Sequence, residues 1–293
     1  MEVQVIKGEY YRSLSEENRI KHVPIPAPRG RILARGGEVL AGNIETKKKI
    51  EFSAEKGFTL SDDIINASDE DIVAVYERYY PLEDEFSHAL GYLAKAGVDD
   101  VNKINPNCPE KGPVLSDSLI GKTGLEESYE CLLSGIPGEE IVEVDASGDK
   151  IRTLGRKEPI PGKDLRTNID YGLQSALAKE MFAKKGAVIV TDTQGGILAF
   201  YSYPTFDPNI FLSKDNSEAI SSLLNNEDLP FFNRVIGGTF HPGSVFKPLV
   251  AIAALEEGLI DRDFTYDDHG VIKVNEYSYS NWYFTEYGRT EGT

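Results

Sequence analysis

A hairpin pattern in the second half of the chain limits the possible folds more than any other segment. GAVIVTDTQGGILAFYSYP contains two apolar stretches, residues 187–190 and 197–203, joined by a glycine-containing turn. This pattern predicts two antiparallel strands. The flanking segments YGLQSALAKEM (171–181) and PLVAIAALEEG (248–258) predict helices, because their apolar residues recur with the helical period. The order helix, hairpin, helix favours an α+β fold.

The first half of the chain gives more varied signals. The three prolines of HVPIPAPRG (22–30) exclude a helix and favour an edge strand. GRILARGGEVLAGN (30–43) predicts a hairpin at its Gly-Gly pair. An acidic first turn and a broad apolar face predict a helix over residues 60–80. Residues 125–135 predict a shorter helix that ends at a glycine.

The segment RKEPIPGKD (156–164) has two prolines and a glycine, which makes it the best candidate for a linker. A chain of 293 residues is long enough for two domains of ordinary size. We therefore predict one domain over residues 1–160 and a second over residues 161–293.

The net charge of −17 argues against a nucleic-acid partner, because phosphate backbones bind clustered lysine and arginine. It also argues against a polybasic patch for a membrane surface. No apolar run approaches the roughly 18 residues that span a bilayer, and polar residues follow the first methionine too closely for a signal peptide. We expect either a cytosolic protein or a chain that begins after a membrane anchor.

Two cysteines, Cys108 and Cys131, make neither a disulfide framework nor a zinc site. The four histidines are scattered and none forms a pair at metal-ligand spacing. We therefore expect no metal site.

A serine three residues before a lysine occurs three times, so the spacing alone identifies nothing. Ser53 and Lys56 lie in a polar segment that stops at a glycine, and Ser147 and Lys150 lie in a Ser-Gly-Asp turn. We expect both pairs on a solvated surface.

Ser244 and Lys247 form the third pair, in FHPGSVFKP (240–248), directly before the most apolar predicted helix. The Pro-Gly pair predicts a turn in which the backbone can approach a ligand. If the helix is buried, partial desolvation favours the neutral amine of Lys247, which can then act as a base for the Ser244 hydroxyl. The backbone N–H of Ser244 can donate to a developing oxyanion. The alternative is that Ser244 caps the helix and Lys247 is a surface cation.

Five segments occur in an order that resembles one protein family: APRGRILARGGEVLAGN, GKTGLEESYECLLSGIPG, DLRTNIDYGLQ, GGILAFYSYPTFDPN and PFFNRVIGGTFHPGSVFK. The last segment resembles the Ser-x-x-Lys region of penicillin-binding proteins, the serine transpeptidases that cross-link peptidoglycan. The first two resemble N-terminal signatures of the monofunctional class B members. The other two resemble the start and the first hairpin of the transpeptidase domain. By this resemblance the chain is identified as a class B penicillin-binding protein.

The sequence departs from the family pattern in several places. The string Lys-Thr-Gly at Lys122 precedes the nucleophile, whereas the family's catalytic copy follows it, so we expect Lys122 to be structural or exposed. After Lys247 neither the family's middle motif nor a second Lys-Thr-Gly occurs, which leaves its substrate-binding residues unknown. The tail NWYFTEYGRTEGT resembles the segment before the middle motif in elongation-type members. We therefore expect a trimmed fragment of a longer, membrane-anchored enzyme, and we expect this fragment to be inactive by itself. Ala34 and Asn168 also replace residues that are usual in the family.

The resemblance implies an α+β fold with two parts. The first is an elongated N-terminal pedestal domain, and the second an incomplete transpeptidase domain with an antiparallel sheet flanked by helices. It implies that Ser244 attacks the D-Ala-D-Ala carbonyl of a stem peptide while Lys247 takes its proton. D-Ala then leaves, and an amine of a neighbouring stem resolves the acyl-enzyme. No metal or organic cofactor is implied.

The implied partners are peptidoglycan stem peptides, β-lactams and proteins of a cell-wall elongation or division complex, and not nucleic acid. The implied location is the extracytoplasmic face of the cell membrane, through an anchor outside this chain. Two alternatives remain. The chain could be a non-catalytic docking module of cell-wall synthesis. It could also be a β-lactam-sensing receptor or β-lactamase, which the two N-terminal signatures disfavour.

Overall fold

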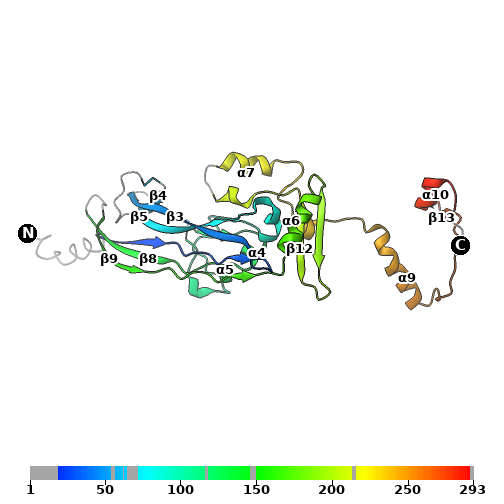
Figure 1. The fold of residues 1–293 in the computed structure, drawn as a ribbon, viewed down its shortest axis with the longest axis horizontal. Helices are drawn as coiled ribbons and strands as arrows, with labels where there is room; N and C mark the ends of the chain where they lie inside the picture. The colour runs from blue at the N-terminus through cyan, green and yellow to red at the C-terminus, as the bar shows by residue number, and fades with distance from the viewer. Residues whose placement is uncertain are drawn as a thin grey trace, which may run out of the picture. The chain divides into compact units, whose positions relative to one another are not determined.

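A computed structural model describes residues 19–53, 57–61, 63–64, 72–115, 118–145, 150–212 and 216–290 of the chain (Figure 1). The chain divides into two compact units, Met1–Gly238 and Thr239–Thr293. None of the helices in the described ranges has the length and apolar character that a bilayer crossing requires.

The first unit is built mainly of strands. They are β1 (Ile20–Ile25), β2 (Ile32–Leu33), β3 (Val39–Ser53), β4 (Gly57–Ser61), β5 (Ile72–Tyr79), β6 (Leu93–Lys95), β7 (Leu119–Gly121), β8 (Gly138–Val144), β9 (Lys150–Lys157), β10 (Leu165–Arg166), β11 (Gly186–Thr191) and β12 (Ile197–Tyr203). Its helices are η2 (Glu83–Phe86), α3 (Ser87–Leu90), η3 (Pro109–Lys111), α4 (Gly124–Ser128), α5 (Glu130–Leu133), α6 (Tyr171–Glu180), η4 (Pro208–Phe211), α7 (Ser217–Leu224) and α8 (Arg234–Gly237), where η marks a 3-10 turn.

Two sheets form the body of this unit. The long strand β3 pairs antiparallel with β2, β5 and β4 in turn along its length, and β10 adds to β2 in parallel. The second sheet has the order β1-β8-β9 and is antiparallel throughout. Figure 1 shows the strands of the two sheets running alongside each other. Both sheets contribute to one buried cluster, so they pack face to face: Val23, Ile50, Val73, Val75, Val142 and Val144.

A second buried cluster joins distant parts of the chain. It contains Ile32 of β2, Tyr80, Leu133 of α5 and Ile169, with Phe200 of β12 packed against it. The cluster therefore includes residues from both sides of the predicted division at residue 160. That division stays a prediction, while the boundary between the two compact units lies after Gly238.

Several local predictions are confirmed. The hairpin is β11 and β12, paired antiparallel from Gly186 opposite Tyr203, and the helix before it is α6. A buried glutamine joins them: the Phe200 N–H donates to Gln174 Oε1 at 2.8 Å, and Gln174 Nε2 donates to the Phe200 carbonyl at 2.9 Å. The proline-containing segment forms β1 at a sheet edge, and the Gly-Gly segment joins β2 to β3.

The predicted helix over residues 60–80 is wrong. Its first residues belong to β4 and its last to β5, while residue 62 and residues 65–71 lie outside the described ranges. β5 pairs with eight successive residues of β3, and its buried Val73 and Val75 alternate with exposed neighbours. β-branched and aromatic residues suit such a half-buried strand, and strand pairing overrides the helical pattern. The helix predicted at 125–135 exists as two short helices, α4 and α5, divided at Tyr129.

The prediction for the cysteines also needs correction. Cys108 and Cys131 form a disulfide bond, although their number and spacing suggest no framework. Cys108 lies just before η3 in the loop between β6 and β7, and Cys131 lies within α5. The bond therefore connects this loop to a helix 23 residues further along the chain.

The second unit contains the 3-10 turn η6 (Gly243–Phe246), helix α9 (Lys247–Glu256), a hairpin of β13 (Val271–Val274) and β14 (Tyr277–Ser280), and helix α10 (Trp282–Tyr287). Only Gly270 is buried among its described residues. This unit therefore has well-formed elements but almost no core of its own.

Candidate functional site

Ser244 and Lys247 lie on one turn at the start of the second unit. Ser244 is in η6, and the Lys247 N–H donates to the Ser244 carbonyl to close the 3-10 turn. Lys247 is also the first residue of α9. In a 3-10 turn the side chains at positions i and i+3 eclipse one another. The local fold therefore directs the hydroxyl and the amine toward the same side of the chain.

The residues around this turn explain why it forms here. Gly243 has a φ of 56°, which a residue with a Cβ adopts at a cost, so glycine permits the entry to the turn. Pro248 lies in the first turn of α9, where a missing N–H breaks no helical hydrogen bond. Pro-Gly before the serine and proline after the lysine thus fix where the turn begins and the helix follows.

The alternative role of Ser244 as a helix cap is not what the structure shows. The residue before η6 is Pro242 and the residue before α9 is Phe246, and neither helix start has a side-chain cap. Among the described residues, no side-chain hydrogen bond joins Ser244 to Lys247, and no ion pair holds the lysine amine. Ser244 is exposed, and its side chain does not cap a helix.

The prediction that α9 is buried is wrong for this chain. None of its residues is buried, and Leu249, Val250 and Ile252 are each more than half exposed. No sheet within residues 239–290 covers the helix, because the only strands there are the small β13–β14 hairpin. Lys247 therefore lies at a solvent-exposed helix start and not near a core.

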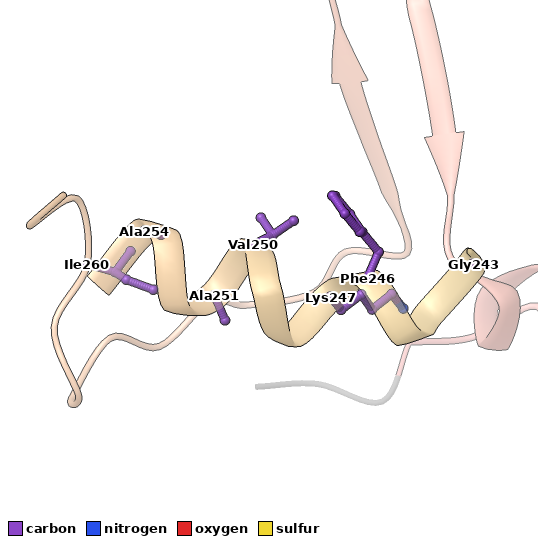
Figure 2. A pocket seen from close by; sticks show the side chains of 7 residues that line it. All are labelled: Gly243, Phe246, Lys247, Val250, Ala251, Ala254 and Ile260. Carbon is purple, nitrogen blue, oxygen red and sulfur yellow. The ribbon is translucent and has the colours of Figure 1, made fainter. Parts of the chain in front are cut away.

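An open hollow of about 360 Å³ runs along α9 beside the lysine. Figure 2 shows Phe246, Lys247 and Val250 along the helix, with Ile260 returning beside Ala254. The Ile260 N–H donates to the Ala254 carbonyl, which holds this return in place. The hollow is lined mainly by apolar groups and does not include the Ser244 side chain.

Two other lysines that the sequence singled out, Lys122 and Lys150, form ion pairs in the first unit. Lys122 donates to Asp100 Oδ2 at 2.7 Å and lies beside β7, which supports the expected structural role. Lys150 begins β9 and donates to Glu140 Oε1 at 2.9 Å with its side chain only 11% exposed, so the prediction of a solvated Lys150 is wrong. Lys56 and Ser147 lie outside the described residues. Among the described residues, no three histidine, cysteine, aspartate or glutamate side chains gather as a metal site requires.

Glu126 of α4, in the first unit, is completely buried and accepts hydrogen bonds from three side chains. Arg29 Nε donates to Glu126 Oε2 at 2.7 Å, and Arg78 Nε donates to Glu126 Oε1 at 2.7 Å. The Tyr80 hydroxyl donates to the same Oε1 at 3.1 Å. Arg29 also bonds both carboxylate oxygens of Glu130 on α5, at 2.7 and 3.1 Å. Two arginines thus balance two glutamates inside the unit, and we call these five residues the buried charge network.

Burial and charge act together on this network. Burial disfavours the charged form of Arg29, but the carboxylates of Glu126 and Glu130 outweigh burial and raise its pKa. Burial, followed by the charge of Glu126, raises the pKa of the Tyr80 hydroxyl. Arg29 therefore stays cationic and Tyr80 neutral near neutral pH.

The network joins segments that are far apart in the sequence. Arg29 comes from APRGR, and Glu126 and Glu130 come from GLEESYE. Arg78 was missed because its segment was predicted as an amphipathic helix. Its neighbours Glu77 and Tyr79 give no sequence signal that the arginine is buried.

Two family models match parts of the chain. The family model of the penicillin-binding protein dimerisation domain matches residues 71–167, and that of the penicillin-binding protein transpeptidase domain matches residues 186–293. The chain is 32% identical to the peptidoglycan D,D-transpeptidase MrdA of Escherichia coli K12, over 99% of the chain and 54% of that protein. It is 31% identical to MrdA of Acinetobacter baumannii, over 98% of the chain and 49% of that protein.

A solved structure of a peptidoglycan synthase complex, described as coordinating polymerization and crosslinking, contains a similar chain. The TM-score is 0.66 and the identity 27%, over 99% of this chain and 57% of that one. The chain belongs to the penicillin-binding proteins. It spans about half the length of the curated relatives that it matches.

Proposed function

We propose that this chain belongs to a peptidoglycan D,D-transpeptidase in which Ser244 is the nucleophile and Lys247 its general base. Ser244 Oγ attacks the carbonyl of the terminal D-Ala-D-Ala peptide bond, and its proton passes to the Lys247 amine. The tetrahedral intermediate collapses and releases D-Ala, which leaves a seryl ester. An amine of a second stem peptide then attacks this ester and regenerates the serine.

The observation that carries this proposal is the single turn that holds both side chains. Of the three Ser-x-x-Lys pairs in the sequence, this one is closed by a hydrogen bond between the two residues' own backbones. It lies inside the segment matched by the transpeptidase model. The exposed position of Ser244 also leaves its hydroxyl accessible to a peptide or a β-lactam.

The test is acylation by a fluorescent penicillin followed by intact-mass measurement. We expect one penicillin-sized adduct on the full-length protein that contains this chain and none on its Ser244→Ala variant. Lys247→Arg keeps the positive charge but cannot supply a neutral amine near pH 7, so it should remove the adduct too. Ser278→Ala in the exposed β14 is the matched control and should label like the parent chain. A label that persists in Ser244→Ala, or a folded full-length protein that takes no label, contradicts the proposal.

The proposal also includes the domain organisation, the cellular location and a partner protein. Residues 1–160 would form a pedestal and partner-docking domain and residues 161–293 part of the catalytic domain, at the extracytoplasmic face of the membrane. The likeness to a chain of a peptidoglycan synthase complex that coordinates polymerization and crosslinking supports a partner that polymerises peptidoglycan. The resemblance of the tail NWYFTEYGRTEGT favours a role in cell-wall elongation. Co-purification of the whole membrane protein with such a polymerising enzyme tests this, and its reproducible absence would remove the docking assignment.

A further inference from the structure

The short helix α5 is a junction for several distant segments. Its residue Glu130 accepts from Arg29 and, through Oε2, from the Gly121 N–H at 2.9 Å. The carbonyl of Leu133 accepts from the Gly30 N–H at 2.8 Å. Strand β7 and the segment after β1 are thus both anchored on a helix of four residues.

A helix of four residues has little stability of its own, because nucleation is costly and one turn returns few hydrogen bonds. The position of α5 therefore depends on links to the rest of the unit. Two links come from the loop between β6 and β7. Lys111 donates to Ser134 just after α5, and the disulfide joins Cys108 to Cys131 in the middle of the helix. The second link is covalent and acts on the residue next to Glu130.

Cys108 is 3% exposed, so the folded unit shields this end of the bond from external reagents. An oxidant must therefore reach the thiols before the loop has packed, while the chain is still folding. Disulfides form and persist in oxidising compartments, which sets where this step takes place. The inference uses only the first unit and does not depend on the acyl-transfer chemistry proposed for Ser244.

We propose that the Cys108–Cys131 bond is a functional modification, installed by thiol–disulfide exchange, that positions α5 so that Glu130 holds Arg29 and Gly121. In the exchange two cysteine thiols lose two protons and two electrons, and the bond between their sulfur atoms forms. The two electrons reduce the disulfide of an external disulfide oxidant to a pair of thiols, so the reaction balances. Cys108 and Cys131 act as positioning residues for the buried charge network.

The positioning is tested by amide hydrogen exchange on the oxidised chain and on a chain that is reduced and alkylated while unfolded and then refolded. We expect exchange at the Gly30 and Gly121 amides to quicken by at least about tenfold, since their acceptors lie on α5. The Phe200 amide is the internal control, because it also donates to a buried side chain, Gln174, but lies far along the chain from the disulfide. Its exchange should stay unchanged.

Two variants sharpen this result. The double variant Cys108→Ser, Cys131→Ser should reproduce the loss of protection at Gly30 and Gly121. Lys111→Met removes the non-covalent link but keeps the disulfide, so protection should change less than threefold. Unchanged protection in both the reduced chain and the serine variant overturns the positioning role. Equal loss at Phe200 also overturns it, because the bond would then stabilise the whole unit and not α5 in particular.

The installation step is tested by refolding the reduced chain with oxidised glutathione or without an oxidant. Alkylation under denaturing conditions and intact mass count the free thiols. With oxidised glutathione both cysteines should escape alkylation and protection at Gly30 and Gly121 should return, whereas without oxidant both cysteines should be alkylated and protection should stay low. Full protection without oxidant contradicts the proposal. So does a chain from an oxidising compartment that still carries two free thiols.

Discussion

Leucines in short helices of the two units have opposite surroundings. Leu133 in the four-residue α5 is completely buried, whereas Leu249 in the ten-residue, more apolar α9 is 58% exposed. The longer and more apolar helix, α9, is thus the one whose leucine is exposed to solvent. In the first unit two sheets and several loops lie against each other, while residues 239–290 supply one hairpin and two helices. The comparison teaches that an apolar pattern predicts an element, but burial depends on which other elements lie against it.

The largest expected effect of burial concerns the ion pairs of the first unit. Arginine–glutamate pairs of the same length occur there both buried and exposed. Glu126 and Glu158 each accept from an arginine Nε at 2.7 Å, but only Glu126 is buried. We expect Glu126→Gln to lower the free energy of unfolding by about 3–5 kcal/mol, because it leaves two buried arginines underpaired. Urea denaturation followed by circular dichroism measures this loss.

Glu158→Gln is the control for this measurement. It should change the free energy of unfolding by no more than about 0.5 kcal/mol, as is usual for exposed pairs. Equal losses in the free energy of unfolding for the two substitutions would mean that burial does not decide how much these pairs contribute to stability.

The two leucines give the next largest contrast. Leu133→Ala should cost about 2–5 kcal/mol, the transfer energy of the lost methyl groups together with the cavity that remains. Leu249→Ala should change stability by less than about 0.5 kcal/mol, since its side chain is already hydrated. The same denaturation experiment compares them. A large loss for Leu249→Ala would show that another surface covers α9 in solution.

His88 provides a smaller, pH-dependent effect in the first unit. Burial, with a contribution from nearby Arg234, lowers the pKa of its imidazole below the ordinary 6.5, although Nε2 lies 3.2 Å from the Pro204 carbonyl oxygen. The unfolded chain therefore binds a proton near pH 6.5 before the folded chain does. Stability is complete above that pH and falls as the pH drops through the folded pKa, with a slope of at most about 1.4 kcal/mol per pH unit.

The measurement compares the free energy of unfolding of the parent chain and of His88→Gln between pH 7.5 and pH 5. The difference between the two curves should be constant above pH 6.5 and shrink below it. A difference that does not vary with pH would refute the burial effect.

The sequence predicted what local patterns determine. The hairpin of β11 and β12, helix α6 and the turn at Ser244 follow from glycines, prolines and apolar spacing within a few residues. The strand β5 was predicted as a helix, because its pairing with β3 depends on residues about thirty positions earlier. The pairing of Cys108 with Cys131 and the role of Arg78 were missed for the same reason. Each depends on a contact between segments that the sequence does not place side by side.

The parallel pair of β2 and β10 has a consequence for how the protein is made. Arg31, beside β2, bonds Asp164, beside β10, across 133 residues. A ribosome that adds 5–20 residues per second needs roughly 7–27 s to extend the chain from one to the other. During that interval the outer edge of β2 has no partner strand, even though β3 can already pair with its inner edge. The N-terminal segment is thus synthesised early but closes its sheet late, and a nascent chain that stalls before Asp164 presents an open edge to its neighbours on the polysome.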